Sequence, residues 1–259
     1  MVAQVVEIWT AADAPPPSGV IERHAVVLPY EGLFGFRVGA RSDLFDAQRA
    51  LFVTAGQEYA DSHPVEGVGH AALVVRPSDE VLEELFGSSR PSAHIAFHRM
   101  GASMTARGRM RTQRLRRVGR AGDNPLRDDE RVLATLREVA PERAASADRG
   151  SRIVDRAREV LHALGFERVT LDRIAREVGV SPNYLTQAFT RAEGQPLYRY
   201  QLGLRLNRAL VELPHSDDIT ALALDLGFSS HAHFSTAFKA SFGQSPSEYR
   251  AGARAVVRA

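Results

Sequence analysis

The 259-residue sequence contains no cysteine. This absence excludes disulfide bonds, thiolate metal sites, cysteine nucleophiles and thiol-based redox switches. The sequence also contains one tryptophan and one lysine, Lys239, beside many arginines. We interpret the preference for arginine first as a compositional bias of the genome and only second as a functional choice.

The sequence also lacks the run of about 18 apolar residues that a membrane-spanning helix needs. Its first residues, MVAQVVEIWT, do not follow the basic-then-apolar layout of a secretory signal. We therefore expect a cytoplasmic protein with no membrane partner. Because 44% of the residues are apolar and 25% are charged, the chain should fold in water, and its length favours two domains.

The charges are spread unevenly, although the formal net charge is only +2. Acidic residues outnumber basic ones before residue 87, whereas residues 90–120 hold nine arginines and no acid. We interpret this arginine run as a solvated or partner-facing helix rather than as a contact to nucleic acid. From Ser151 onward the sequence is mildly basic, which suits a partner that carries phosphates.

The first half predicts a small β-rich module followed by helices. Over about the first 75 residues, short apolar runs alternate with glycine and proline turn signals: VVEIW, HAVVL, LFGFRV, RALFV and HAALVV. Helical spacing then predicts a helix from Ser78 to about Gly87 and another over Asp128–Val139. We also expect helix across much of residues 88–123, without a clear apolar period to define it.

An apolar stripe on the predicted helix Asp128–Val139 makes that helix a candidate dimer surface. The polar, small-residue stretch PERAASADRG, residues 141–150, follows and is the candidate linker. These boundaries divide the chain into an N-terminal domain, residues 1–140, and a C-terminal domain, residues 151–259.

The C-terminal half contains a pattern that occurs twice, first over residues 170–189. Thr170 can cap a short helix, Gly179 can supply a left-handed turn, and Ser181 followed by Pro182 can begin a second helix. The inward positions of the second helix are apolar. Its outer face carries polar side chains that can hydrogen-bond to base edges: Asn183, Thr186, Gln187 and Thr190. This layout is typical of a helix-turn-helix unit.

The second copy covers residues 218–243 and has its turn glycine at Gly227. Three phenylalanines at helical spacing anchor its second helix. The outer face of that helix carries His231, Ala232, Ser235, Thr236 and Lys239. Ala232 can offer only an apolar contact, such as one to a thymine methyl group, so its polar neighbours must supply any hydrogen-bonded readout.

A helical segment, LYRYQLGLRLNRALVEL, separates the two copies. At 1.5 Å per residue it would span roughly 25 Å, which could hold two helices near the ~34 Å separation of successive major grooves. The run from Ser245 to Glu248 then predicts a capping box at the start of a final helix.

These residues together resemble the DNA-binding domain of the AraC/XylS family. The resemblance extends from Arg152 to Arg250. It is carried by the first unit through Phe189 and Gly194, the run Arg205–Ala209, the turn Leu226–Ser230, and Phe234, Phe238, Gly243, Pro246, Tyr249 and Arg250. The family's fold, seven helices with two helix-turn-helix units joined by a long helix, is what this resemblance implies.

The resemblance also implies roles for individual residues. Base contacts would fall to Asn183, Thr186, Gln187 and Thr190 in the first unit, and to His231, Ala232, Ser235 and Thr236 in the second. Ser229 and Ser230 would contact phosphates. Many relatives carry an amide where this chain has His231, so a base preference at that position does not carry over.

Four histidines, His63, His70, His94 and His98, raise the alternative of a metal-dependent cupin-type enzyme with a helical appendage. His63-Pro64 and the glycines after it loosely resemble the cupin-like effector domain of many AraC-type regulators. Stoichiometric metal in the pure protein would favour the enzyme. A DNA-repair methyl acceptor is excluded, because the chain has no acceptor thiol.

The sequence therefore predicts an α+β chain, with a β-rich, cupin-like N-terminal module with helices and an all-α C-terminal domain. We expect a DNA-binding transcription regulator, not an enzyme, with no cofactor. Its expected partners are double-stranded DNA, RNA polymerase, a second copy of the chain and a small-molecule effector sensed by the N-terminal module.

Overall fold

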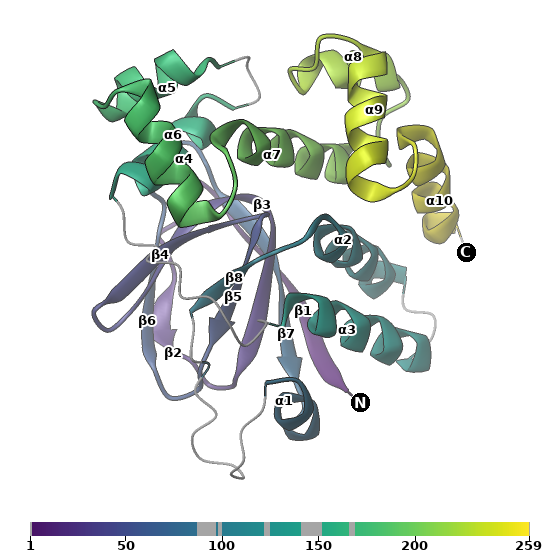
Figure 1. Ribbon diagram of the computed structural model, residues 1–259. Helices are drawn as coiled ribbons and strands as arrows, with labels where there is room; N and C mark the ends of the chain where they lie inside the picture. The colour runs from purple at the N-terminus through teal and green to yellow at the C-terminus, as the bar shows by residue number, and fades with distance from the viewer. Residues whose placement is uncertain are drawn as a thin grey trace.

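The computed structural model describes residues 2–86, 97, 100–121, 125–140, 152–165 and 169–258. A β-rich region comes first in the chain and an all-helical region second (Figure 1). This arrangement confirms the predicted fold class. The candidate linker, residues 141–150, lies outside the described residues, as do His94 and His98.

The β-rich region contains strands β1 to β8 and helices α1 to α3. The strands are β1 (Ala3–Thr10), β2 (Ser18–Val20), β3 (Ala25–Val38), β4 (Arg41–Asp46), β5 (Arg49–Val53), β6 (Glu58–Ser62), β7 (His70–Pro77) and β8 (Gly101–Ser103). The helices are α1 (Asp79–Phe86), α2 (Ala106–Ala121) and α3 (Pro125–Val139). The predicted helix that ends near Gly87 is α1, and the poorly defined stretch that follows holds β8 as well as α2.

Strand β3 is the centre of the sheet, since it pairs antiparallel with β4, β5, β6 and β7. The sequence predicted two strands here, HAVVL and LFGFRV, separated by a turn at Gly32. That prediction is wrong, because one long strand continues through an irregularity between Pro29 and Glu31. Gly32 has a φ of +76°, and a Cβ there would collide with the carbonyl of Gly69. The glycine therefore permits a bend and a close approach of two backbones.

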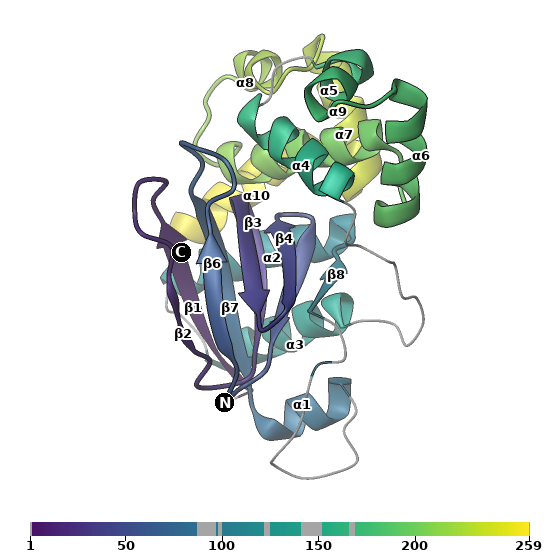
Figure 2. The same ribbon diagram turned by 90° about the vertical axis from the view of Figure 1, so that its left-hand side faces the viewer.

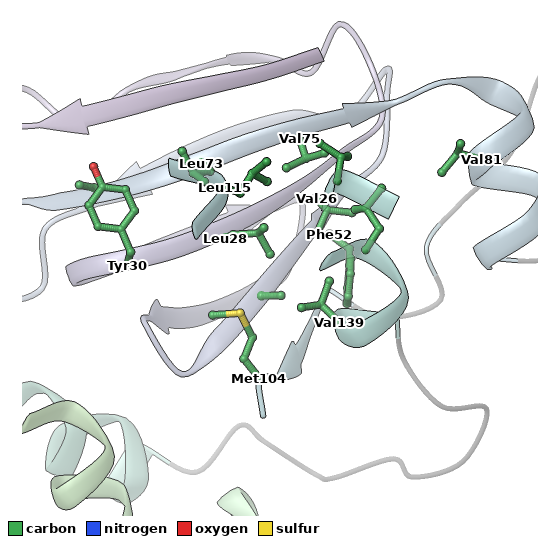
Figure 3. Packing of buried hydrophobic residues seen from close by; sticks show 14 of the residues in the cluster. Val26, Leu28, Tyr30, Phe52, Leu73, Val75, Val81, Met104, Leu115 and Val139 are labelled. Carbon is green, nitrogen blue, oxygen red and sulfur yellow. The ribbon is translucent and has the colours of Figure 1, made fainter. Parts of the chain in front are cut away.

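Alternate residues of β3 face two separate cores, because successive side chains of a strand point to opposite faces. Val26 and Leu28 belong to the core between the sheet and the helices. Ala25 and Val27 belong to a second core, on the opposite face of the strand, which is formed mainly by residues of the strands. Figure 3 shows the first of these cores, where Val26 and Leu28 lie near Val139 of α3. Sheet and helices thus form one packed unit.

The apolar stripe of α3 lies inside the protein. Val132, Leu136 and Val139 are at most 3% exposed and belong to the core between the sheet and the helices. The stripe is therefore unavailable to a second copy of the chain, and the interpretation of this stripe as a dimer surface is wrong. Residues toward solvent on α3, such as Glu130 and Arg137, are charged.

The arginine-rich helix α2 is also used within the chain. Arg116 forms an ion pair with Glu7 of β1 and lies over the ring of Tyr30. Arg117 lies over the ring of Tyr249 in the last helix. The interpretation of this run as a solvated or partner-facing helix is wrong for these residues. Arg116 holds α2 against the sheet, and Arg117 contacts the last helix of the helical region.

A carboxyl group in β6 is expected to make stability depend on pH. Burial raises the pKa of Asp61 to about 7, and its Oδ1 has no hydrogen-bond partner among the described residues. The folded state therefore holds this proton more tightly than the unfolded chain does, so the contribution of Asp61 to stability falls as pH rises from about 4 through 7. Replacing Asp61→Asn should stabilise the protein increasingly over that range, as measured by urea unfolding.

The control for this experiment is Asp13→Asn at an exposed position. Its difference in stability from the wild type should stay within about 0.5 kcal/mol at every pH. A gap between Asp61→Asn and the wild type that is constant from pH 4 to pH 8 would contradict the assignment.

The helical region contains α4 (Arg152–Ala163), α5 (Leu171–Val178), α6 (Pro182–Glu193), α7 (Leu197–Glu212), α8 (Ile219–Asp225), α9 (His231–Phe242) and α10 (Pro246–Arg258). Figures 1 and 2 both place these helices beyond one end of the strands. Within the described part of the chain, none of the helices has the length and apolar character needed to cross a bilayer.

Candidate nucleic-acid interface

Helix α7 joins two helical groups, α4 to α6 at one end and α8 to α10 at the other (Figure 1). Leu197 and Tyr200, near its start, belong to the core of the first group. Leu206, Leu210 and the residues around them belong to the core of the second. One continuous helix, about 24 Å long at 1.5 Å per residue, thus contributes to both cores and fixes their separation.

The first unit has the predicted caps and turn. The Thr170 hydroxyl accepts a hydrogen bond from the backbone N–H of Arg173 at 3.3 Å and caps α5. Gly179 ends this helix in the left-handed conformation, with φ +79°. Ser181 then caps α6, because its hydroxyl accepts from the Tyr184 N–H at 3.3 Å. These local signals confirm the predicted helix-turn-helix boundaries.

The second unit repeats this construction. Asp218 caps α8 by accepting from the backbone N–H groups of Thr220 and Ala221. Gly227, with φ +77°, forms the turn, and the Ser230 hydroxyl caps α9 by accepting from the His233 N–H at 3.2 Å. The predicted capping box is also present, since Glu248 and Ser245 exchange hydrogen bonds at the start of α10.

The outer face of α6 presents most of the predicted residues to solvent. Asn183, Gln187 and Thr190 are exposed. The amide of Gln187 donates to Oδ1 of Asn183 at 3.3 Å, so the two side chains lie together one turn apart. Thr186 is half-buried and its hydroxyl donates to the carbonyl of Pro182 at 2.9 Å, which leaves it less available than its neighbours.

The outer face of α9 is similar, with His231, Ala232, Thr236 and Lys239 exposed and Ser235 half-buried. The hydroxyl of Ser235 lies 3.4 Å from Nε2 of His231, again one turn away. In the turn before α9, the hydroxyl of Ser229 lies 3.1 Å from Nδ1 of His233. Ser229 and Ser230 are both exposed at the N-terminus of this helix.

Two residues of these surfaces were missed by the sequence analysis. Tyr184 of α6 is 52% exposed beside Asn183, and His233 of α9 is exposed beside Ala232. The signal that could have found them is their place relative to the caps. Each is the third residue after a capping serine, Ser181 or Ser230, and each donates the backbone N–H that the cap accepts.

The charges of the two outer helices suit an anionic partner. Neither α6 nor α9 has an acidic residue in its first turn, and α9 contains no acid at all. Each carries a basic residue in its last turn, Arg191 and Lys239. Because the N-terminus of a helix carries partial positive charge, an acid-free first turn favours an approaching phosphate.

Comparison with known proteins identifies this region. A family model described as a helix-turn-helix domain matches residues 174–252. The HTH-type transcriptional activator RhaS of Escherichia fergusonii is 39% identical over 87 residues, 33% of this chain and 31% of that protein. The C-terminal region is an AraC-type helix-turn-helix DNA-binding domain. The match to the family model begins within α5 and ends within α10, and so includes most of the first unit, all of α7 and all of the second unit.

Other proteins are similar to a part of this chain of comparable length. The HTH-type transcriptional regulator ArgR of Pseudomonas aeruginosa is 41% identical over 85 residues, 32% of this chain. The chain covers only 26% of the length of ArgR, so most of that regulator is unmatched. A crystal structure of an AraC-type regulator from Chromobacterium violaceum shares 35% identity over 39% of this chain and 91% of that one, with a TM-score of 0.37.

A second family model, for bacterial regulatory proteins of the tetR family, matches residues 153–191. These residues contain only the first unit of the AraC-type domain, with α4 and α5 and nearly all of α6. The first model extends across the second unit as well. The paired arrangement therefore favours the AraC type.

The metal-enzyme alternative was raised by four histidines, of which the structure describes His63 and His70. In the described ranges, no group of three or more histidine, aspartate or glutamate residues is placed to hold a metal ion. His63 and His70 lie together, with ring centroids 5.7 Å apart, and His70 also stacks on Phe34. Burial, and to a smaller extent the nearby His63, lower the pKa of His70 to about 4, so this ring is neutral at pH 7.

A buried ionic cluster joins the AraC-type domain to the β-rich region. Arg158 of α4 is fully buried, and its Nε donates to the hydroxyl of Tyr200 at 3.0 Å. Its Nη2 donates to the carbonyl of Leu44 in β4 at 2.8 Å. Nη2 also lies 3.9 Å from the carboxylate of Asp46, and Nη1 lies 3.8 Å from that of Asp43.

Asp46 receives further hydrogen bonds from the helical side. The Tyr200 hydroxyl donates to its carboxylate, and Nε2 of His162 lies 3.2 Å from the same oxygen. Burial by itself would raise the pKa of Asp46, but the hydrogen bonds from His162 and Tyr200 and the charge of Arg158 outweigh it and hold the pKa well below its usual range. Asp46 therefore stays ionised at neutral pH, and its contacts with Arg158, His162 and Tyr200 hold α4 and α7 against the end of the sheet.

Proposed function

We propose that this chain regulates transcription by inserting α6 and α9 into successive major grooves of a promoter site. The observation that carries the proposal is the pair of similar helix-turn-helix units whose cores share α7. Asn183, Gln187 and Thr190 of α6, and His231, Ala232, Ser235 and Thr236 of α9, would contact base edges, with Thr186 and Lys239 contributing from the margins. Ser229 and Ser230 would contact phosphates.

The remaining partners are also part of the proposal. RNA polymerase would be recruited or blocked by the bound regulator, and two copies of the chain would occupy paired sites on the DNA. The β-rich region would sense a small-molecule effector. Its attachment to α4 and α7 supports this role, because a change at the contact would act on both units.

Base readout can be tested one side chain at a time. Because a good contact to a base edge contributes about 1 to 3 kcal/mol of discrimination, Gln187→Ala and Ser235→Ala should each relax the sequence preference at a few base pairs. The base pairs affected by the two changes should differ, since the residues lie on different helices. Selection of bound sites from random duplexes, followed by titration of single-base variants, measures the change.

Asn183 and His231 lie one helical turn from the replaced residues and are unchanged in both variants. The preference at the base pairs that these two residues contact should therefore be retained. Wild-type preference at every base pair in both variants would contradict these assignments. Binding should also weaken steeply with salt as counterions are released from the DNA. Affinity that does not change with salt would argue against the whole proposal.

A further inference from the structure

A cavity of about 260 Å³ lies between the β-rich region and the AraC-type domain. Its wall on the sheet side includes Glu31 of β3 and Val68 in the loop before β7. On the helical side it is lined by α4, through Leu161, and by α7, through Leu204 and Asn207. A molecule held here would contact the first helix-turn-helix group, the spacer helix and the sheet at once.

Asn207 is the feature of this wall that most needs a partner. It is 3% exposed, and neither its amide oxygen nor its amide nitrogen has a hydrogen-bond partner within the described part of the chain. Buried polar groups are nearly always paired, because an unpaired one costs about 1 to 3 kcal/mol. A ligand with a donor next to an acceptor would satisfy both atoms of the amide.

The charged residues around the cavity are already paired. Arg208 forms ion pairs with Glu31 and Glu212, and His162 lies against Asp46. An anionic ligand would therefore meet no uncompensated cation, and a cationic ligand would compete with Arg208 for its carboxylates. The apolar residues Leu161, Leu204 and Val68 provide the rest of the contact surface that a compact ligand needs.

We propose that this cavity binds an uncharged small molecule with a carboxamide-like edge, a donor beside an acceptor, on a compact apolar body. The amide of Asn207 would pair with that edge. This inference rests on the proposed function, since it gives the effector a position at the junction and not inside the sheet. A ligand that binds best when the sheet, α4 and α7 are in contact would stabilise this one arrangement of the two DNA-reading units.

The test uses thermal unfolding of the full chain, without DNA, in the presence of neutral and charged probes. Benzamide and 2-pyrrolidone present the proposed edge, and benzoate has the same ring as benzamide with a charge in place of the amide. Benzamide or 2-pyrrolidone should raise the Tm of the wild type in a concentration-dependent manner, because a ligand that binds only the folded state stabilises it. Benzoate should not.

Two variants locate the binding site. Asn207→Leu removes both the donor and the acceptor of the side-chain amide, and Ala47→Leu fills the cavity from a different wall position while leaving Asn207 intact. Each should weaken the apparent affinity for the neutral probe at least tenfold. The matched control is Gln4→Leu, which replaces an exposed amide on β1 and should leave the affinity unchanged.

Three results would overturn the inference: no shift with either neutral probe, as a cavity that holds only water would give; an equal shift with benzoate; or an unchanged shift in both cavity variants. DNA binding by the wild type without probe, measured by fluorescence anisotropy, separates this failure from failure of the proposed function. Intact DNA binding with no probe binding rejects the ligand site alone.

Discussion

Replacing Arg158 by methionine is expected to lower the free energy of unfolding by about 3 to 5 kcal/mol. The methionine keeps much of the volume but removes the charge that faces Asp46 and Asp43. Asp46 is fully buried, so its carboxylate would remain in the interior with one cation fewer. Equilibrium unfolding in urea at pH 7 measures the loss.

The matched control lies on the same helix. Arg156 is exposed and pairs with Glu159 on the surface of α4. Exposed ion pairs contribute between about 0 and 1 kcal/mol, so Arg156→Met should change stability little. Similar losses for Arg156→Met and Arg158→Met would contradict the view that the buried cluster stabilises the contact between the sheet and the AraC-type domain.

The Arg158→Met penalty should also depend on pH. Because the folded state depresses the pKa of Asp46, this group contributes stability above its unfolded pKa of about 4, and that contribution is lost as pH falls further. Once Asp46 can take up a proton, the variant no longer buries an uncompensated charge. The difference between wild type and variant should therefore be smaller at pH 3 than at pH 7.

A carboxylate on the outer face of either recognition helix is expected to remove most of the DNA affinity. Gln187 of α6 and Thr236 of α9 are both exposed and occupy the same position relative to the capping serines of their helices. A negative charge against the DNA should cost several kcal/mol, so Gln187→Glu and Thr236→Glu should each weaken binding about a hundredfold or more. Fluorescence anisotropy with a selected duplex measures the change.

Combining the two substitutions should reduce binding to the level of random duplex. Gln57→Glu is the control, because it adds the same charge at an exposed position of the β-rich region. The affinity of this control for the selected duplex should change only a few-fold. The comparison therefore separates repulsion between the recognition helix and the DNA from the effect of a changed net charge. Loss of affinity in only one of the two variants would mean that a single unit contacts DNA, contrary to the proposal.

The two helix-turn-helix units could be predicted from the sequence because their signals are local. The caps at Ser181 and Ser230 and the turn glycines Gly179 and Gly227 each act within a few residues. The sequence spacing also separated the buried phenylalanines from the exposed polar residues. Tyr184 and His233 were missed, although the same spacing from each cap places them on the surface.

The strands were predicted less completely, because a strand depends on partners far away in the chain. The runs that became β1, β5 and β7 were recognised, but β2, β4 and β6 were not. The continuity of β3 through Gly32 depends on the approach of Gly69, which no local pattern reveals. The apolar stripe of α3 was recognised as a contact surface, but only packing decided that the sheet covers it.

By itself, then, the sequence determined the two helix-turn-helix units, their outer polar faces and the spacer between them, since each follows from contacts within one or two turns of helix. Only the tertiary structure decided that Arg158 and Tyr200 meet Asp46 and that Asn207 faces a cavity at the junction. Asp46 lies more than a hundred positions before Arg158 and Tyr200 along the chain. Their partners are set by how the sheet and the helices pack, and burial there makes each polar group depend on the partner it receives.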